Sequence, residues 1–146
     1  MSRNIPTEAQ WEEWLGDIEV VSAHKTFFGK SNDEVQVDFY RCVLERADEL
    51  RFMPDEPFQY YILGFRDFIL AGNFQLFDAA DAASSFLKLV EYRLSKKPDS
   101  IKPICDELIP TVNYVSKNQK MFDADVDIYG DFCELKIKIE LLIKGS

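Results

Sequence analysis

The sequence is poor in the residues that build most metal and catalytic centres. It has one histidine, His24, which excludes zinc sites built on several imidazoles. Its three cysteines, Cys42, Cys105 and Cys133, are odd in number, and their spacing matches no metal-binding or redox motif. A free cysteine inside a protein behaves as a small apolar side chain. We therefore predict structural thiols, and we expect no metal or other cofactor.

Long apolar runs and glycine-rich loops are also missing. The most apolar run, residues 60–71, is interrupted by Arg66 and Asp67 and is too short to cross a bilayer. No apolar stretch of the kind found in a signal peptide follows the first residues. The six glycines are scattered and form no phosphate-binding loop, and no nucleophile motif surrounds His24. We therefore expect a cytoplasmic protein that is not an enzyme and contacts no membrane.

The composition is that of one folded domain. The chain has 146 residues, of which 47% are hydrophobic and 29% charged, so it can bury a core of its own. Apolar residues recur at helical spacing, and capping residues, prolines and glycines divide the pattern into segments. We predict an all-α, single-domain bundle of about six helices over residues 1–146. They begin near Thr7, Ser31, Asp55, Asp78, Ser100 and Asp131.

Two stretches are harder to interpret. Residues 19–30 lose the helical pattern, and within them Phe27, Phe28 and Gly29 indicate a turn that carries buried rings. In the last segment, residues 131–143, apolar residues alternate with Lys136, Lys138 and Glu140 in the manner of a strand, although a helical face also fits. A single strand would have no partner for its backbone groups. We favour a helix and keep the strand as the alternative.

The segment 123–134 carries acidic residues at the ligand spacing of an EF-hand calcium loop. The glycine that such a loop needs at its sixth position is replaced by Ile128, and the sequence holds no second loop of this type. An aspartate-rich helix start, stabilised by capping, is the preferred interpretation. The weak calcium alternative would use five carboxylates: Asp123, Asp125, Asp127, Asp131 and Glu134.

Acidic residues are gathered in blocks. The 26 Asp and Glu exceed the 17 Lys and Arg, giving a net charge of −9, which argues against direct nucleic-acid binding. Residues 8–19 carry five acidic side chains and no basic one, and residues 33–56 carry eight against three arginines. Blocks of one sign can steer an oppositely charged partner.

Aromatic residues lie close to these blocks. Adjacent residues such as Tyr60 and Tyr61 point in different directions from a helix, so we expect one of the two rings to be exposed. Tryptophan and tyrosine ringed by charge are typical of interface hot spots. The predicted docking surface consists of Trp11, Glu12, Glu13, Trp14, Asp17, Asp33, Glu34, Asp38 and Tyr60.

Together these features predict an acidic protein-binding domain. The most concrete hypothesis is an immunity-type inhibitor that neutralises a basic toxin such as a nuclease, because acidic steering suits a positively charged active site. The alternative is a helical adaptor or regulatory subunit that binds a partner through an aromatic groove. A calcium-linked or enzymatic domain ranks third. The sequence does not identify the partner or the oligomeric state.

Overall fold

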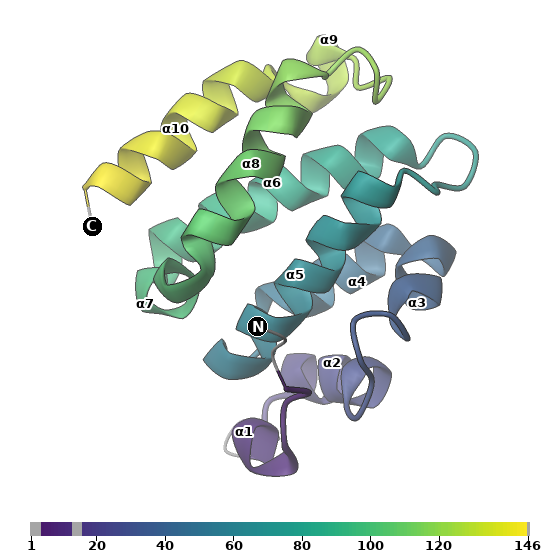
Figure 1. The fold of residues 1–146 in the computed structure, drawn as a ribbon, viewed down its shortest axis with the longest axis vertical. Coiled ribbons are helices and arrows are strands. Elements are labelled where there is room, and N and C mark those ends of the chain that lie inside the picture. The colour runs from purple at the N-terminus through teal and green to yellow at the C-terminus, as the bar shows by residue number, and fades with distance from the viewer. Residues whose placement is uncertain (1–3, 13–15, 146) are drawn as a thin grey trace.

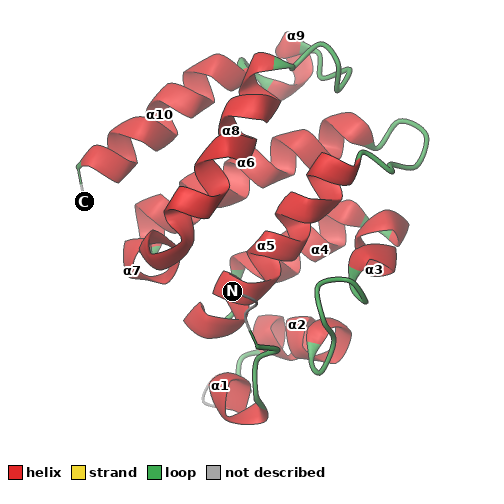
Figure 2. Ribbon diagram, in the orientation of Figure 1, coloured by secondary structure: helices red, strands yellow, loops and turns green. Residues whose placement is uncertain are grey.

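The computed structural model describes residues 4–12 and 16–145, and these residues form helices and loops without any strand (Figure 2). The predicted all-α fold is thus confirmed. The helices are α1 (Glu8–Glu12), α2 (Ile18–Phe27), α3 (Gln36–Arg41), α4 (Val43–Arg51), α5 (Asp55–Ala71), α6 (Ala79–Lys96), α7 (Pro98–Ile101), a 3₁₀ turn at Lys102–Ile104, α8 (Cys105–Lys117), α9 (Val126–Tyr129) and α10 (Phe132–Lys144).

Helix α6 is the centre of the bundle. It packs against α4 on one side and α10 on the other, and also contacts α5, α7 and α8. In Figure 1, α5 and α8 lie in front of α6, while α1 and α2 occupy the lower end of the molecule. The α5–α6 loop and α9 lie at the opposite, upper end (Figure 1). The buried apolar side chains form one continuous core between these helices.

The predicted second helix is present but divided. Its apolar stripe, Val35, Phe39, Val43, Ala47 and Leu50, is buried throughout, as its spacing predicts. The backbone leaves helical geometry at Cys42, where φ is −157° and ψ is 85°. This break lets α3 pack on α5 while α4 packs on α6 and α2.

Two sequence interpretations are settled in favour of helix. The expected loss of helix over residues 19–30 is wrong for most of its length, because α2 spans Ile18–Phe27 and buries Val20, Ala23 and Phe27 along one face. The predicted turn is present at Phe28 and Gly29, where the Phe27 ring is buried but the Phe28 side chain is 40% exposed. The strand alternative for residues 131–143 is also wrong. Helix α10 starts at Asp131, whose side chain accepts a hydrogen bond from the Cys133 backbone N–H at 2.8 Å. Its buried face packs against α6 and α8.

A buried arginine joins α6 to the end of α4. The Arg93 side chain is 0% exposed and stacks on the Phe58 ring at 3.9 Å. Its Nη1 donates to the carbonyls of Arg51 and Met53, each at 3.0 Å, and its Nε donates to Ser100 Oγ at 3.1 Å. Burial lowers the pKa of Arg93 to about 10, so the guanidinium remains charged at neutral pH.

Candidate functional site

Of the three aromatic residues predicted as exposed anchors, the structure describes two, and both lie in the core. Trp11 is 0% exposed and Tyr60 is 8% exposed, so the prediction of surface anchors is wrong for both. Tyr60 and Tyr61 are both buried, because the loop before α3 covers α5 on a second side. The Tyr60 hydroxyl accepts a hydrogen bond from the Asn32 backbone N–H at 3.1 Å. Trp14 lies outside the described residues.

The single histidine has a packing role beside Trp11. The His24 ring lies edge-on to Trp11, with centroids 5.3 Å apart, and stacks on Phe28 at 4.6 Å. Its Nε2 lies 3.1 Å from a carboxylate oxygen of Glu8. These contacts join α1 to the last turn of α2.

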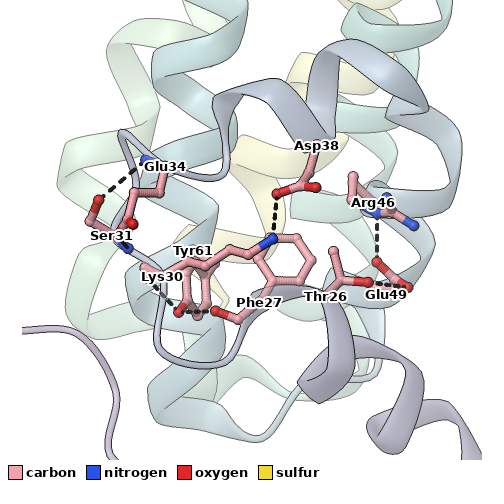
Figure 3. Close-up of polar contacts among 9 residues, drawn as sticks. All are labelled: Thr26, Phe27, Lys30, Ser31, Glu34, Asp38, Arg46, Glu49 and Tyr61. Atoms are coloured by element: carbon pink, nitrogen blue, oxygen red, sulfur yellow. Dashed lines mark hydrogen bonds and ion pairs between the residues drawn. The ribbon is translucent and has the colours of Figure 1, made fainter.

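The acidic residues predicted beside these rings have unequal exposure. Asp38 is buried and paired with Lys30 at 3.1 Å, so it offers no free charge (Figure 3). Asp17 is exposed and caps α2, accepting from the Glu19 N–H at 3.0 Å. Asp33 is exposed and makes no side-chain hydrogen bond or ion pair within the described part of the chain. Glu13 and the side chain of Glu12 lie outside the described residues.

Glu34, also exposed, forms a complete capping box with Ser31. Its carboxylate accepts the Ser31 backbone N–H at 2.8 Å, and Ser31 Oγ accepts the Glu34 N–H at 3.2 Å (Figure 3). The hydrogen bonds from Ser31 lower the pKa of Glu34. Below this box, the Tyr61 hydroxyl lies 2.7 Å from the carbonyls of both Phe27 and Lys30, and burial raises its pKa. Glu34 thus serves to hold the shape of this loop.

A second polar cluster holds α2 against α4. Glu49 is 9% exposed and accepts hydrogen bonds from Arg46 at 2.6 Å, Ser22 at 2.8 Å and Thr26 at 3.4 Å. Figure 3 shows Thr26 and Arg46 approaching this carboxylate from the two helices. With three donors around it, the buried charge is satisfied, and the cluster is structural.

The acidic segment 123–134 is built as a pair of helix starts. Asp125 Oδ1 accepts the Asp127 N–H at 2.9 Å at the start of α9, and Asp131 begins α10 in the same way. The preferred interpretation of this segment, capped helix ends, is thus confirmed. Among the described residues, no group of three or more His, Cys, Asp or Glu side chains is placed to hold a metal ion. Asp123 and Asp127 remain exposed, as does Glu134.

Three strongly exposed apolar side chains gather at the end of the molecule that carries this acidic segment. Leu76 and Phe77, in the α5–α6 loop, are each 82% exposed, and Ile128 in α9 is 73% exposed. Phe77 has a φ of +73°, a left-handed conformation that is strained for a residue with a large side chain. We call this region the tip. It borders an open pocket of about 410 Å³, whose lining includes Leu76, Phe77, Phe122, Ile128, Asp123 and Asp125.

The tip pocket continues into a shallow groove over α6. Ile128 and Tyr129 line both, and the groove adds Leu44 of α4 and Lys88 of α6. The Tyr129 hydroxyl donates to Asp81 Oδ1 at 2.8 Å, which fixes the short α9 helix against the start of α6. This hydrogen bond to a carboxylate raises the pKa of Tyr129, so the phenol stays protonated.

The docking surface predicted from sequence does not include the tip. The sequence predicts the acidic half of the tip only as a possible calcium loop or a helix start. The apolar half lies in the stretch 73–78, Asn-Phe-Gln-Leu-Phe-Asp, between the glycine that ends α5 and the aspartate that precedes α6. Adjacent Leu76 and Phe77 in so short a loop are the signal that could have revealed it.

Neither the scan against protein-family models nor the searches of curated proteins and solved structures found a match to this chain. In the described part of the chain, no helix is both long enough and apolar enough to cross a membrane. The functional assignment therefore rests on the chain's own chemistry.

Proposed function

We propose that this chain is a protein-binding domain that docks a basic partner. The observation that carries the proposal is the tip, where strongly exposed Leu76, Phe77 and Ile128 lie beside the carboxylates of Asp123 and Asp125. Contiguous exposed apolar side chains bordered by charge mark interaction sites on folded proteins. The net charge of −9 favours a partner of the opposite sign.

Its most specific form is an immunity-type inhibitor of a basic toxin such as a nuclease, acting in the cytoplasm. An inhibitor of this kind needs a rigid surface and fast association, and it needs no catalytic groups. Acidic residues speed association with a positively charged active site, while buried apolar contacts slow dissociation. The charge of the whole chain and the exposed apolar tip would supply these two contributions.

A helical adaptor is the second candidate, and a further open pocket between α4 and α6 favours it. This pocket shares Leu44 and Lys88 with the groove, and its lining also includes Asp48, Arg51 and Tyr92. The lining mixes both charges with an aromatic ring, which suits an amphipathic helix better than a strongly basic surface. An adaptor would therefore bind a partner of mixed charge through α4 and α6.

Purification of the tagged chain from its native host, with mass spectrometry of the proteins that accompany it, identifies the partner. Each candidate is then produced alone and its binding kinetics are measured. For a basic toxin, we expect stoichiometric loss of toxic or nuclease activity. Raising salt from about 50 to about 500 mM should slow association more than it speeds dissociation. An acidic partner, or association indifferent to salt, would contradict the inhibitor and favour the adaptor.

A further inference from the structure

The tip exposes apolar surface that the rest of the chain leaves uncovered. Leu76 and Phe77 extend from the α5–α6 loop, and Ile128 faces the same pocket from α9, some fifty residues later in the chain. Two separate segments thus contribute to a single open pocket of about 410 Å³. A pocket of this size accepts a large apolar side chain with part of its flanking backbone.

The charged side chains that line the pocket are of one sign. Asp123 and Asp125 belong to its lining, which contains no Lys or Arg among the described residues. Asp127 and Asp131 follow in the same connection, and both are exposed. Lys88 lies in the adjoining groove, outside the pocket. A ligand that enters the pocket therefore meets carboxylates at its margin.

We propose that the tip pocket is the docking site for a basic segment of a protein partner. One apolar or aromatic side chain of that segment enters between Leu76, Phe77 and Ile128, and neighbouring lysines or arginines pair with Asp123 and Asp125. This inference rests on the proposed function and adds to it the place and the chemistry of recognition.

Charge complementarity selects this occupant over the other candidates. A second copy of the chain would bring its own aspartates against these aspartates, and like charges brought together at an interface are unfavourable. An anionic membrane surface would be repelled for the same reason. A basic segment with an apolar anchor gains from both parts of the site, because the anchor buries apolar surface while its charges steer approach.

The probe for this proposal is a library of random twelve-residue peptides displayed on phage and selected on the full chain. We expect the enriched peptides to share an aromatic or large aliphatic residue flanked by lysine or arginine. The best peptide, made synthetically, is then titrated against the wild-type chain and its variants by calorimetry.

The tip variants are chosen to preserve the fold. Phe77→Asn removes the ring at a position where asparagine tolerates the positive φ, and Ile128→Ser changes an exposed side chain. Asp123, with a φ of +58°, is changed to Asn for the same reason. The matched control is Ile18→Ser, which changes an 82% exposed side chain on α2 at the opposite end of the molecule (Figure 1).

We expect Phe77→Asn and Ile128→Ser each to weaken binding about tenfold or more, with Ile18→Ser within about twofold of wild type. Asp123→Asn should weaken binding several-fold at low salt and less at high salt, because salt screens the lost attraction. Circular dichroism and thermal unfolding of each variant separate a loss of binding from a loss of fold.

The remaining outcomes would overturn the assignment in distinguishable ways. If basic peptides are enriched but only Asp33→Asn weakens their binding, the partner is basic as proposed, and the assignment of the tip as its docking site fails. If enriched peptides lack lysine and arginine, or none is enriched, the proposed function fails with it. If sedimentation shows a dimer that Phe77→Asn abolishes, the occupant is a second copy. Binding of phosphatidylserine vesicles that Phe77→Asn abolishes would assign the tip to a membrane.

Discussion

Arg93 of α6 lies in the core with none of its side chain exposed. We expect its replacement by an apolar residue of similar size to destabilise the fold. Replacing buried ion pairs by apolar groups is often harmless, because both charges leave together. Here the partners are the backbone carbonyls of Arg51 and Met53, which no side-chain substitution removes. Arg93→Met would remove the donor from both carbonyls, of which the Met53 carbonyl is in a buried hydrogen bond and the Arg51 carbonyl in a partly buried one.

The expected cost follows from those two acceptors. A buried acceptor left without a donor costs about 1–3 kcal/mol. The lost stack of the guanidinium on Phe58 adds to this, although a methionine sulfur regains part of it. The variant no longer buries a charged group, and the desolvation cost that it avoids offsets part of this loss of stability. We expect Arg93→Met to lower the free energy of unfolding by about 2–4 kcal/mol. Arg93→Ala, which also leaves a cavity, should lower it by at least about 2 kcal/mol more.

Urea unfolding followed by circular dichroism measures these changes. Two controls separate the causes. Asp55→Asn removes the carboxylate that lies 3.9 Å from Arg93 Nη2 but is 58% exposed, so its effect should stay below about 1 kcal/mol. Lys96→Met places the same apolar residue at an exposed site of the same helix and should change stability by less than about 0.5 kcal/mol. An Arg93→Met variant as stable as wild type would refute the reasoning from unpaired carbonyls.

Three further predictions concern the fold. Gly64→Ala should cost about 1–3 kcal/mol despite the better helix propensity of alanine, because its Cβ would overlap the Asn32 side chain. In a chain that already carries Asn32→Ala, Gly64→Ala should cost much less, as measured by urea unfolding. If the destabilising effects of the two substitutions simply add, the overlap is contradicted. Wild type should be more stable than Glu34→Gln at neutral pH, because the charged carboxylate is the form that the capping box favours. This difference in stability should disappear as the pH falls through the pKa of Glu34, which lies below its ordinary value of 4.5. Thermal unfolding between about pH 7 and about pH 2 tests this, and a constant difference would count against it. Lys138→Pro, inside α10, should cost about 3 kcal/mol or more and reduce helical ellipticity, whereas an unchanged spectrum would contradict the helix.

Features set by residues close in sequence were predictable. The capping box at Ser31 and Glu34 is present with both hydrogen bonds, because its two partners are three residues apart. At Thr7, the backbone N–H donates to the Gln10 side chain at 2.8 Å, as the same spacing predicts. The apolar stripe from Val35 to Leu50 identified the buried face correctly even though the helix itself is broken at Cys42.

Features set by distant contacts were not predictable. Tyr60 and Tyr61 point in different directions from α5, and periodicity alone would leave one of them exposed. Both are buried because the loop before α3 folds over α5, and the hydrogen bond from Asn32 to Tyr60 spans 28 positions. The same limit applies to Trp11, whose ring is covered partly by His24 from the next helix. The faces of a helix that become buried depend on how all the helices and loops pack together. A local sequence pattern does not contain that information.

The tip shows why a docking surface in a helical bundle is better sought in its loops than in its helix patterns. The regular apolar stripes of these helices are buried in the core, so aromatic residues within them are poor candidates for partner contacts. Leu76 and Phe77 belong to no such stripe, and the short loop that holds them leaves them exposed. Phe77 keeps a strained backbone there without gaining burial. In the loop between α5 and α6, these paired large apolar residues bury little of their own surface against the rest of the chain. A partner that covers them is the physical reason we assign to their presence.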